Sequence, residues 1–313
     1  MLARPGFVLV LALVLAGCWS GRSASGPPRW RHTAVPEVLP KGAWLVAALD
    51  TEVDSPGQRE KEAKARRDPA SVRNGDSCQF PTTHMAFGVY GRAEVLAASR
   101  GVYHRGAMLG CIADLGRARQ GTSVTEETVG GLDVLELKSS EGSFLFTATD
   151  RGMIVGSSNR ALMTRALAAE GATATSDPAL GPMIRDARAR GELWIAALVP
   201  RGSSTIEDAL AAVGARPTGR VVSLVGAVRL RAPQRIDLAI GVEDEADAGR
   251  LAAALELRRL ALRALADPDL QPLLDAVRVV HDGSRVRIVG EPNGLDWWKT
   301  FRGVTSMISR LAP

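Results

Sequence analysis

The sequence predicts an α+β fold made of two similar halves, each with the element order β-β-β-α-β-β-α and a largely antiparallel sheet with helices packed on one face. Two observations predict this fold. An apolar segment that opens with Gly and contains a Trp occurs twice, as GAWLVAAL at residues 42–49 and as GELWIAAL at residues 191–198. A similar succession of strand and helix patterns follows each copy, which indicates an internal duplication.

After its opening strand, the first half is expected to continue with five strands, one more than the shared order, and two helices. Apolar residues at helical spacing, including Met108, Ile112 and Leu115, indicate the first helix, and Ser158 is the candidate N-cap of the second. The predicted strands are 85–90, 93–98, 132–137, 143–149 and 153–156, and the predicted helices are 107–119 and 159–169.

The second half repeats this order with a longer first helix. Near its end, Val286 and Ile288 alternate with Arg285 and Arg287, so that one face of this strand is expected in the core and the other in solvent. The predicted strands are 221–231, 235–242, 277–281 and 285–290, and the predicted helices are 245–266 and 294–311.

The composition excludes several classes of protein. With 46% hydrophobic and 23% charged residues, the chain is not a polytopic membrane protein, a disordered chain or a fibre. The net charge is +5, and the arginines are spread along the whole chain among acidic residues. A nucleic-acid reader would gather its arginines on one face and offer aromatic residues for stacking, which make up only 4% here. Nucleic acid is therefore not an expected partner.

The first residues have the pattern of an export signal. Arg4 precedes an uncharged apolar run at residues 7–16 (FVLVLALVLA). Ten helical residues span about 15 Å, which is half of the roughly 30 Å hydrocarbon core of a membrane, so this run is too short to cross it. Directly after it comes Leu15-Ala16-Gly17-Cys18.

A signal peptide that ends in small residues and then Cys resembles that of a bacterial lipoprotein, with Leu15-Ala16-Gly17-Cys18 as its lipobox. The resemblance implies that a diacylglyceryl group is added to the Cys18 sulfur, that the Gly17–Cys18 bond is cut and that the new amino terminus is acylated. Two or three acyl chains give stable anchoring in a membrane. The residue after Cys18 is Trp19 and not Asp, which in a Gram-negative cell implies the outer membrane, facing the periplasm.

The sequence therefore predicts four regions. They are the signal peptide (1–17), the lipidated N-terminus and flexible tether (18–38), the first α+β half (39–175) and the second half (176–313). Residues 51–76 carry twelve charges, six of each sign, and almost no large apolar side chain. Such a segment cannot bury a core, so it is expected to be a mobile insertion in the first half.

Cys78 and Cys111 are expected to form a disulfide. An exported protein lies in a compartment that permits disulfides, and two cysteines allow one pairing. The alternative is a metal site formed by Cys78, His84, His104 and Cys111, but these spacings lack the short paired ligands of structural zinc motifs. No metal and no cofactor are expected.

Other candidate functional residues are few. Ser157 and Ser158 lie between a predicted strand and a helix, where a hydrolase can place its nucleophile, but the Gly-x-Ser-x-Gly pattern is absent. Trp297 and Trp298 are neighbours and point about 100° apart on a helix, so a narrow apolar stripe would bury only one of them. They are a candidate ligand or partner contact, with a broad core contact as the alternative.

The leading hypothesis is a lipid-anchored, non-catalytic protein of the cell envelope that acts as a binding or structural module. One alternative is an envelope hydrolase that uses Ser157 or Ser158 with a histidine. The other is a periplasmic carrier of an apolar ligand, which would need a dry cavity of several hundred Å3.

Overall fold

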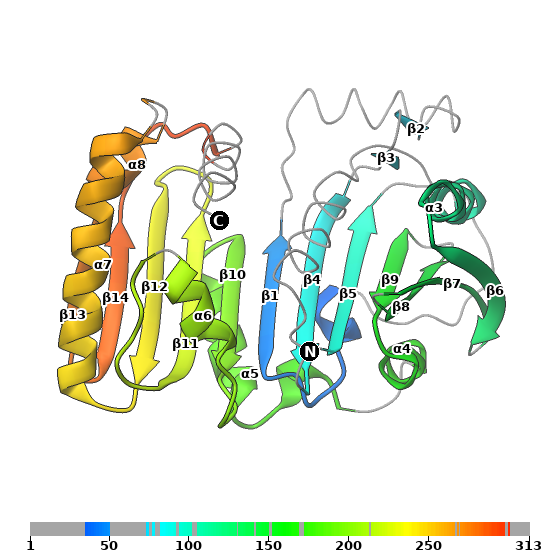
Figure 1. Ribbon diagram of the computed structural model, residues 1–313, viewed down its shortest axis with the longest axis horizontal. Helices are drawn as coiled ribbons and strands as arrows, with labels where there is room; N and C mark the ends of the chain where they lie inside the picture. Colours follow the sequence, from blue (N-terminus) through cyan, green and yellow to red (C-terminus); the bar gives the residue numbers. More distant parts are fainter. Residues whose placement is uncertain are drawn as a thin grey trace. The chain divides into compact units, whose positions relative to one another are not determined.

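The computed structural model describes residues 35–50, 73–74, 77–78, 82–91, 94–101, 105–129, 131–140, 142–149, 152–168, 172–212, 214–266, 268, 270–297 and 300. These residues form a mixed α+β structure with a large antiparallel sheet and six α-helices (Figure 1). The chain divides into two compact units, Met1–Ala43 with Ala48–Asp177 and Trp44–Ala47 with Pro178–Pro313. None of the helices in the described ranges is both long and apolar enough to cross a membrane.

In the first unit, six strands are hydrogen-bonded in the order β4-β5-β9-β8-β7-β6, and every pair is antiparallel. A separate two-stranded ladder pairs β2 with β3. The strands are β1 (Leu45–Asp50), β2 (Arg73–Asn74), β3 (Ser77–Cys78), β4 (Thr82–Tyr90), β5 (Glu94–Gly101), β6 (Ser123–Val129), β7 (Leu132–Ser139), β8 (Gly142–Thr149) and β9 (Met153–Ser157). The division into units falls within β1, after Ala47.

Helix α3 (Arg105–Ala118) covers one face of this sheet. Its Met108 is 1% exposed and packs against Ala148 of β8, which is fully buried. At Gly116 the helix comes so close to the sheet that a Cβ atom would lie 2.5 Å from the Cδ2 atom of Leu137. A small residue is therefore needed at this point of the helix.

Helix α4 (Arg160–Leu167) follows β9 and contacts it. Its N-cap is Asn159, whose Oδ1 accepts a hydrogen bond from the backbone N–H of Leu162 at 3.1 Å. The expectation that Ser158 caps this helix is wrong. The Ser158 hydroxyl instead accepts from the backbone N–H of Val95 at 2.8 Å, because the residue lies beside β5 at the end of the sheet.

The first described element is a 3-10 helix, η1 (Val35–Val38), which contacts β4 and β5. Val35 and Val38 are 1% and 2% exposed. These four residues were expected in the tether, but their apolar side chains are part of the core. Nearby, the buried Tyr90 hydroxyl donates to the carbonyl of Pro40 at 3.0 Å, and burial raises the pKa of Tyr90.

In the second unit, five strands are hydrogen-bonded in the order β13-β14-β12-β11-β10, again with antiparallel pairs only. The strands are β10 (Leu193–Leu198), β11 (Val221–Arg229), β12 (Arg235–Val242), β13 (Val277–Asp282) and β14 (Arg285–Gly290), and the helices are α5 (Leu180–Arg190), α6 (Thr205–Ala212), α7 (Glu245–Leu265) and α8 (Gln271–Ala276).

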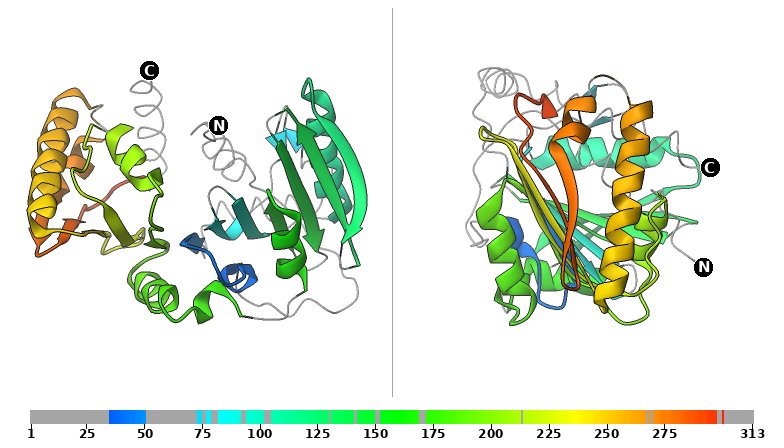
Figure 2. Two further views of the ribbon diagram at one scale, coloured as in Figure 1. Left: turned by 60° about the horizontal axis from the view of Figure 1, so that its bottom comes forward. Right: turned by 90° about the vertical axis from the view of Figure 1, so that its left-hand side faces the viewer.

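Helices lie on both faces of this second sheet. Leu251 of α7 packs in a buried cluster with Ile240 of β12 and Val286 of β14. Asp237 lies three residues before Ile240 and therefore on the opposite face of the sheet. There it contacts Arg190 of α5. Figure 2 shows the two helices on either side of the strands in its right-hand view. The expectation of helices on one face is therefore not met in this unit, because α5 covers β10 and β11 from the other side.

Two predicted elements lie largely outside the described residues. Of the expected insertion at 51–76, only Arg73 and Asn74 are described, as strand β2. Of the helix expected at 294–311, the structure describes residues up to 297 and Thr300, and assigns helix at Trp297 and Thr300. The expectations for the remainder of both segments stay predictions.

Candidate functional site

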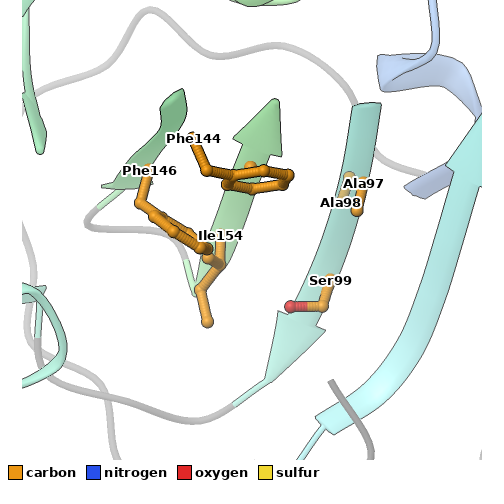
Figure 3. Close-up of a pocket in the computed structure, with 7 residues that line it drawn as sticks. Ala97, Ala98, Ser99, Phe144, Phe146 and Ile154 are labelled. Atoms are coloured by element: carbon orange, nitrogen blue, oxygen red, sulfur yellow. The ribbon is translucent and has the colours of Figure 1, made fainter. Parts of the chain in front are cut away.

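A shallow apolar hollow lies on the face of the first sheet that α3 partly covers. Phe144 and Phe146 of β8 have ring centroids 4.7 Å apart and face Ile154 of the next strand (Figure 3). The other side of the hollow is formed by β5. The lining residues are Ala97, Ala98, Ser99, Phe144, Phe146, Ile154 and Gly156.

The size of the hollow limits what it can hold. Its cavity volume is about 20 Å3, whereas pockets for small organic ligands are usually about 300–1,000 Å3. Gly156 keeps the space open, because a Cβ atom there would lie 2.7 Å from the Phe144 ring. The hollow therefore has room for about one water-sized group and does not enclose a ligand.

Ser157 and Ser158 are tied to the backbone of β5. The fully buried Ser157 hydroxyl donates to the carbonyl oxygens of Val95 at 3.1 Å and Asn159 at 2.9 Å. Both hydroxyls thus bridge the end of β9 to its neighbour. Within the described ranges, neither the Ser157 nor the Ser158 hydroxyl forms a hydrogen bond with a histidine or a carboxylate.

The histidines and cysteines are not gathered into a metal site in the part of the chain that the structure describes, where no group of three His, Cys, Asp or Glu could hold an ion. Cys111 of α3 is 7% exposed and is disulfide-bonded. Its helix contacts β3, the strand that ends at Cys78. His104, the third member of the alternative metal set, lies outside the described residues.

Trp297 is fastened to the second sheet. Its Nε1 donates to the carbonyl of Leu230, just after β11, at 3.0 Å. Gln234 holds the same segment, because its side chain donates to the carbonyl of Leu295 and accepts from the N–H of Leu295, both at 2.9 Å. Trp297 is therefore half-buried and attached at its polar end. The side chain of Trp298 lies outside the described residues.

The most distinctive surface lies on the face of the second sheet opposite α7. We call it the arginine face and define it by the residues that the strand registers place side by side there: Arg235, Asp237 and Ala239 of β12, Arg285, Arg287 and Val289 of β14, and Arg278, Val280 and Asp282 of β13. It contains four arginines and two aspartates. Arg190 of α5 joins it at one side.

Asp237 lies at the centre of these charges. Its side chain is 8% exposed, and its carboxylate is 3.2 Å from Arg190, 3.3 Å from Arg287 and 3.8 Å from Arg235. One carboxylate thus holds three guanidinium groups together. These arginines keep donors directed toward solvent, since the side chains of Arg287 and Arg235 are 42% and 52% exposed. Such a cluster can bind phosphate or carboxylate groups.

The sequence indicated only part of this surface. The alternation at 285–290 predicted a solvent-facing side with Arg285 and Arg287. It did not indicate Asp237, Arg278 or Arg190, because these residues come from other elements and reach the site only through strand register and the position of α5. The one available signal was Asp237, which interrupts the apolar residues that follow Arg235 in its strand.

The chain was compared with protein-family models, curated proteins and solved structures, and none of them matches it.

Proposed function

We propose that this chain is a lipid-anchored, non-catalytic protein of the cell envelope that acts as a binding module. The observation that carries the binding role is the arginine face, where three guanidinium groups share one carboxylate and remain open to solvent. The lipobox Leu15-Ala16-Gly17-Cys18 supports the anchor. In a Gram-negative cell, Trp19 after the lipidated Cys18 favours the outer membrane, with the folded units in the periplasm.

The hydrolase alternative has less support. A serine nucleophile needs a base within hydrogen-bond reach and an oriented acid behind it. The recorded partners of the Ser157 and Ser158 hydroxyls are backbone groups of Val95 and Asn159. Burial of Ser157 also keeps its oxygen away from a substrate.

The anchor is tested by Cys18→Ser expressed with the full signal peptide. Lipid transfer requires the Cys18 sulfur, so we expect an unprocessed precursor that takes up no labelled palmitate, whereas the unaltered chain gives a labelled mature protein in the membrane fraction. A matched control is Cys78→Ser, which leaves the lipobox intact and should remain labelled. Palmitate uptake and membrane retention by Cys18→Ser would show that the lipobox assignment is wrong.

The carrier alternative also has less support, because the hollow beside Phe144 and Phe146 is much smaller than an apolar ligand. We expect an environment-sensitive apolar dye to gain no fluorescence with the unaltered chain. A gain that is lost in Ala97→Leu, which fills the hollow, would instead support a carrier. Ala246→Leu adds the same side chain at an exposed site and is the control.

We also propose that the two units arose by duplication. The strands β4-β5-β9-β8 of the first unit and β11-β12-β14-β13 of the second share one order and one pattern of antiparallel pairs. Strands β4 and β11 have nine residues each, and β5 and β12 have eight. In both units a helix follows this first pair, α3 or α7. Strands β6 and β7 are an addition in the first unit.

We propose Cys78 as the disulfide partner of Cys111. The contact between α3 and β3 supports this pairing, and Cys111 already has a disulfide partner. Closing the 34-residue loop from 78 to 111 would stabilise the fold by about 3–4 kcal/mol in the chain-entropy model.

A further inference from the structure

We infer that the arginine face binds anionic phospholipid headgroups, so that the second unit lies on the membrane to which the Cys18 lipid attaches the chain. The inference rests on the proposed function for the presence of that membrane. The binding surface itself is defined by the described residues of β12, β13 and β14 alone.

The charge of the face favours an anionic partner. It contains four arginines and two aspartates, an excess of two positive charges. Arg190, which joins it from α5, pairs with Asp186 at 2.6 Å as well as with Asp237 at 3.2 Å. Asp237 is already shared by three of those arginines. Arg278 and Arg285 are exposed and form no recorded ion pair within the described residues. They are therefore available to phosphate groups outside the protein.

The face also has an apolar centre. Val280 is 45% exposed and lies opposite Arg287, and Val289 and Ala239 are half-buried on neighbouring strands. An exposed valine surrounded by arginines suits the interface of a membrane, where apolar groups enter the headgroup layer and guanidinium groups meet phosphates. A site for a free anion would gain nothing from Val280.

The face is open over its outer strands. Helix α7 packs on the other side of the sheet, and α5 contacts β10 and β11 (Figure 2). Within the described ranges, no helix lies over the arginine side of β13 and β14. An open sheet surface can meet a lipid surface without a change of fold.

The lipid anchor would raise the effective concentration of the protein at the membrane. Sixteen residues, 19–34, lie between the lipidated Cys18 and the first described residue, Val35. A short tether to a surface gives an effective concentration near the millimolar range, so weak headgroup contacts are sufficient for docking.

The test uses the mature chain 18–313 with Cys18→Ser, which keeps every described residue and lacks the lipid. Its co-sedimentation is measured with phosphatidylcholine vesicles and with vesicles in which about one third of the lipid is phosphatidylglycerol. We expect binding to the anionic vesicles only, and its loss when the salt concentration is raised from about 0.1 M to about 0.5 M.

The double variant Arg278→Gln/Arg285→Gln identifies the surface. Each arginine near an anionic membrane contributes about fivefold to binding, so we expect the partition coefficient to fall about 25-fold. The matched control is Arg201→Gln/Arg216→Gln, which removes the same charge from two exposed arginines in loops outside the face and should lower binding less than threefold. Circular dichroism confirms that both variants fold.

Equal binding to both kinds of vesicle, no binding to either, or an equal loss in the two double variants would overturn the inference. Binding to an acidic polysaccharide in the absence of vesicle binding would overturn it too and would indicate a polymer as the partner. Because the vesicle test uses a chain without lipid, its outcome is independent of the palmitate-labelling test. The two experiments therefore distinguish a wrong lipobox assignment from a wrong assignment of the binding surface.

Discussion

Trp194→Ala is expected to lower the free energy of unfolding of the second unit by about 3–5 kcal/mol. Trp194 is 1% exposed at the second position of β10, opposite Ala227 of β11, and helix α5 packs over these strands. Removing the indole leaves a cavity that small neighbours such as Ala196 and Ala227 cannot fill. Urea denaturation followed by far-UV circular dichroism measures the change.

Two controls make this result specific. Trp194→Phe keeps most of the buried ring area and should cost clearly less than the alanine variant, while Leu257→Ala removes a side chain that is 71% exposed and should change the stability by less than about 0.5 kcal/mol. If Trp194→Ala were as mild as Leu257→Ala, the core assigned to β10 and α5 would be wrong.

Gly152→Ala is expected to destabilise the first unit by about 2–4 kcal/mol. Gly152 forms the turn between β8 and β9 with a φ of +74°, and its carbonyl accepts the N–H of Gly101 at 2.9 Å. A Cβ atom at this position would overlap the backbone oxygen of Gly101. The substitution therefore combines an unfavourable backbone conformation with a steric clash that only a shift of the turn can relieve.

Gly131→Ala separates these two effects. Gly131 has a similar φ of +80°, and a Cβ atom there has nothing within 4 Å. We expect this variant to cost only the backbone strain, about 1–2 kcal/mol. Thermal or urea unfolding measures the loss of stability in both variants, and the difference between the two losses is the cost of the clash. Equal losses of stability would contradict the close approach of Gly152 to Gly101.

Much of the fold could be predicted from the sequence, because strands with one buried face show a period of two. The bounds of β12 and β14 agree with the predicted ones, and α7 ends one residue before the prediction. Strand β6 was not predicted, because its sequence SVTEETV is mostly polar and its residues are largely exposed. It is held in the sheet by backbone pairing with β7, and helix α3 contacts it.

No helix was predicted for the segment that forms α5. The prolines and arginines around it obscured an apolar stripe, in which Leu180, Ile184 and Ala187 are buried. Which sheet face such a helix covers is a tertiary property. A hydrophobic pattern shows that one side is buried, but not against what, and this is why helices on a single face were expected.

The candidate site shows the same limit. Arg285 and Arg287 could be placed on one wet face from alternation alone. Their proximity to Arg278 and Asp237 depends on the β12–β14 and β13–β14 registers, in which Asp237 and Arg278 both lie opposite Val289. Trp297 was a candidate in the sequence because it is next to Trp298. Its hydrogen bond from Nε1 to the carbonyl of Leu230 could not be predicted, because this bond depends on the conformation of the chain after β14.

The carboxylate of Asp237 has a consequence for the order of events during maturation. Clustered guanidinium groups repel one another, and without a counter-charge within the fold only an external anion would relieve this repulsion. Asp237 supplies that counter-charge from within the fold, at 3.2 Å from Arg190 and 3.3 Å from Arg287. The unit can therefore complete its folding in solution, before it meets any surface, and can leave that surface again without unfolding.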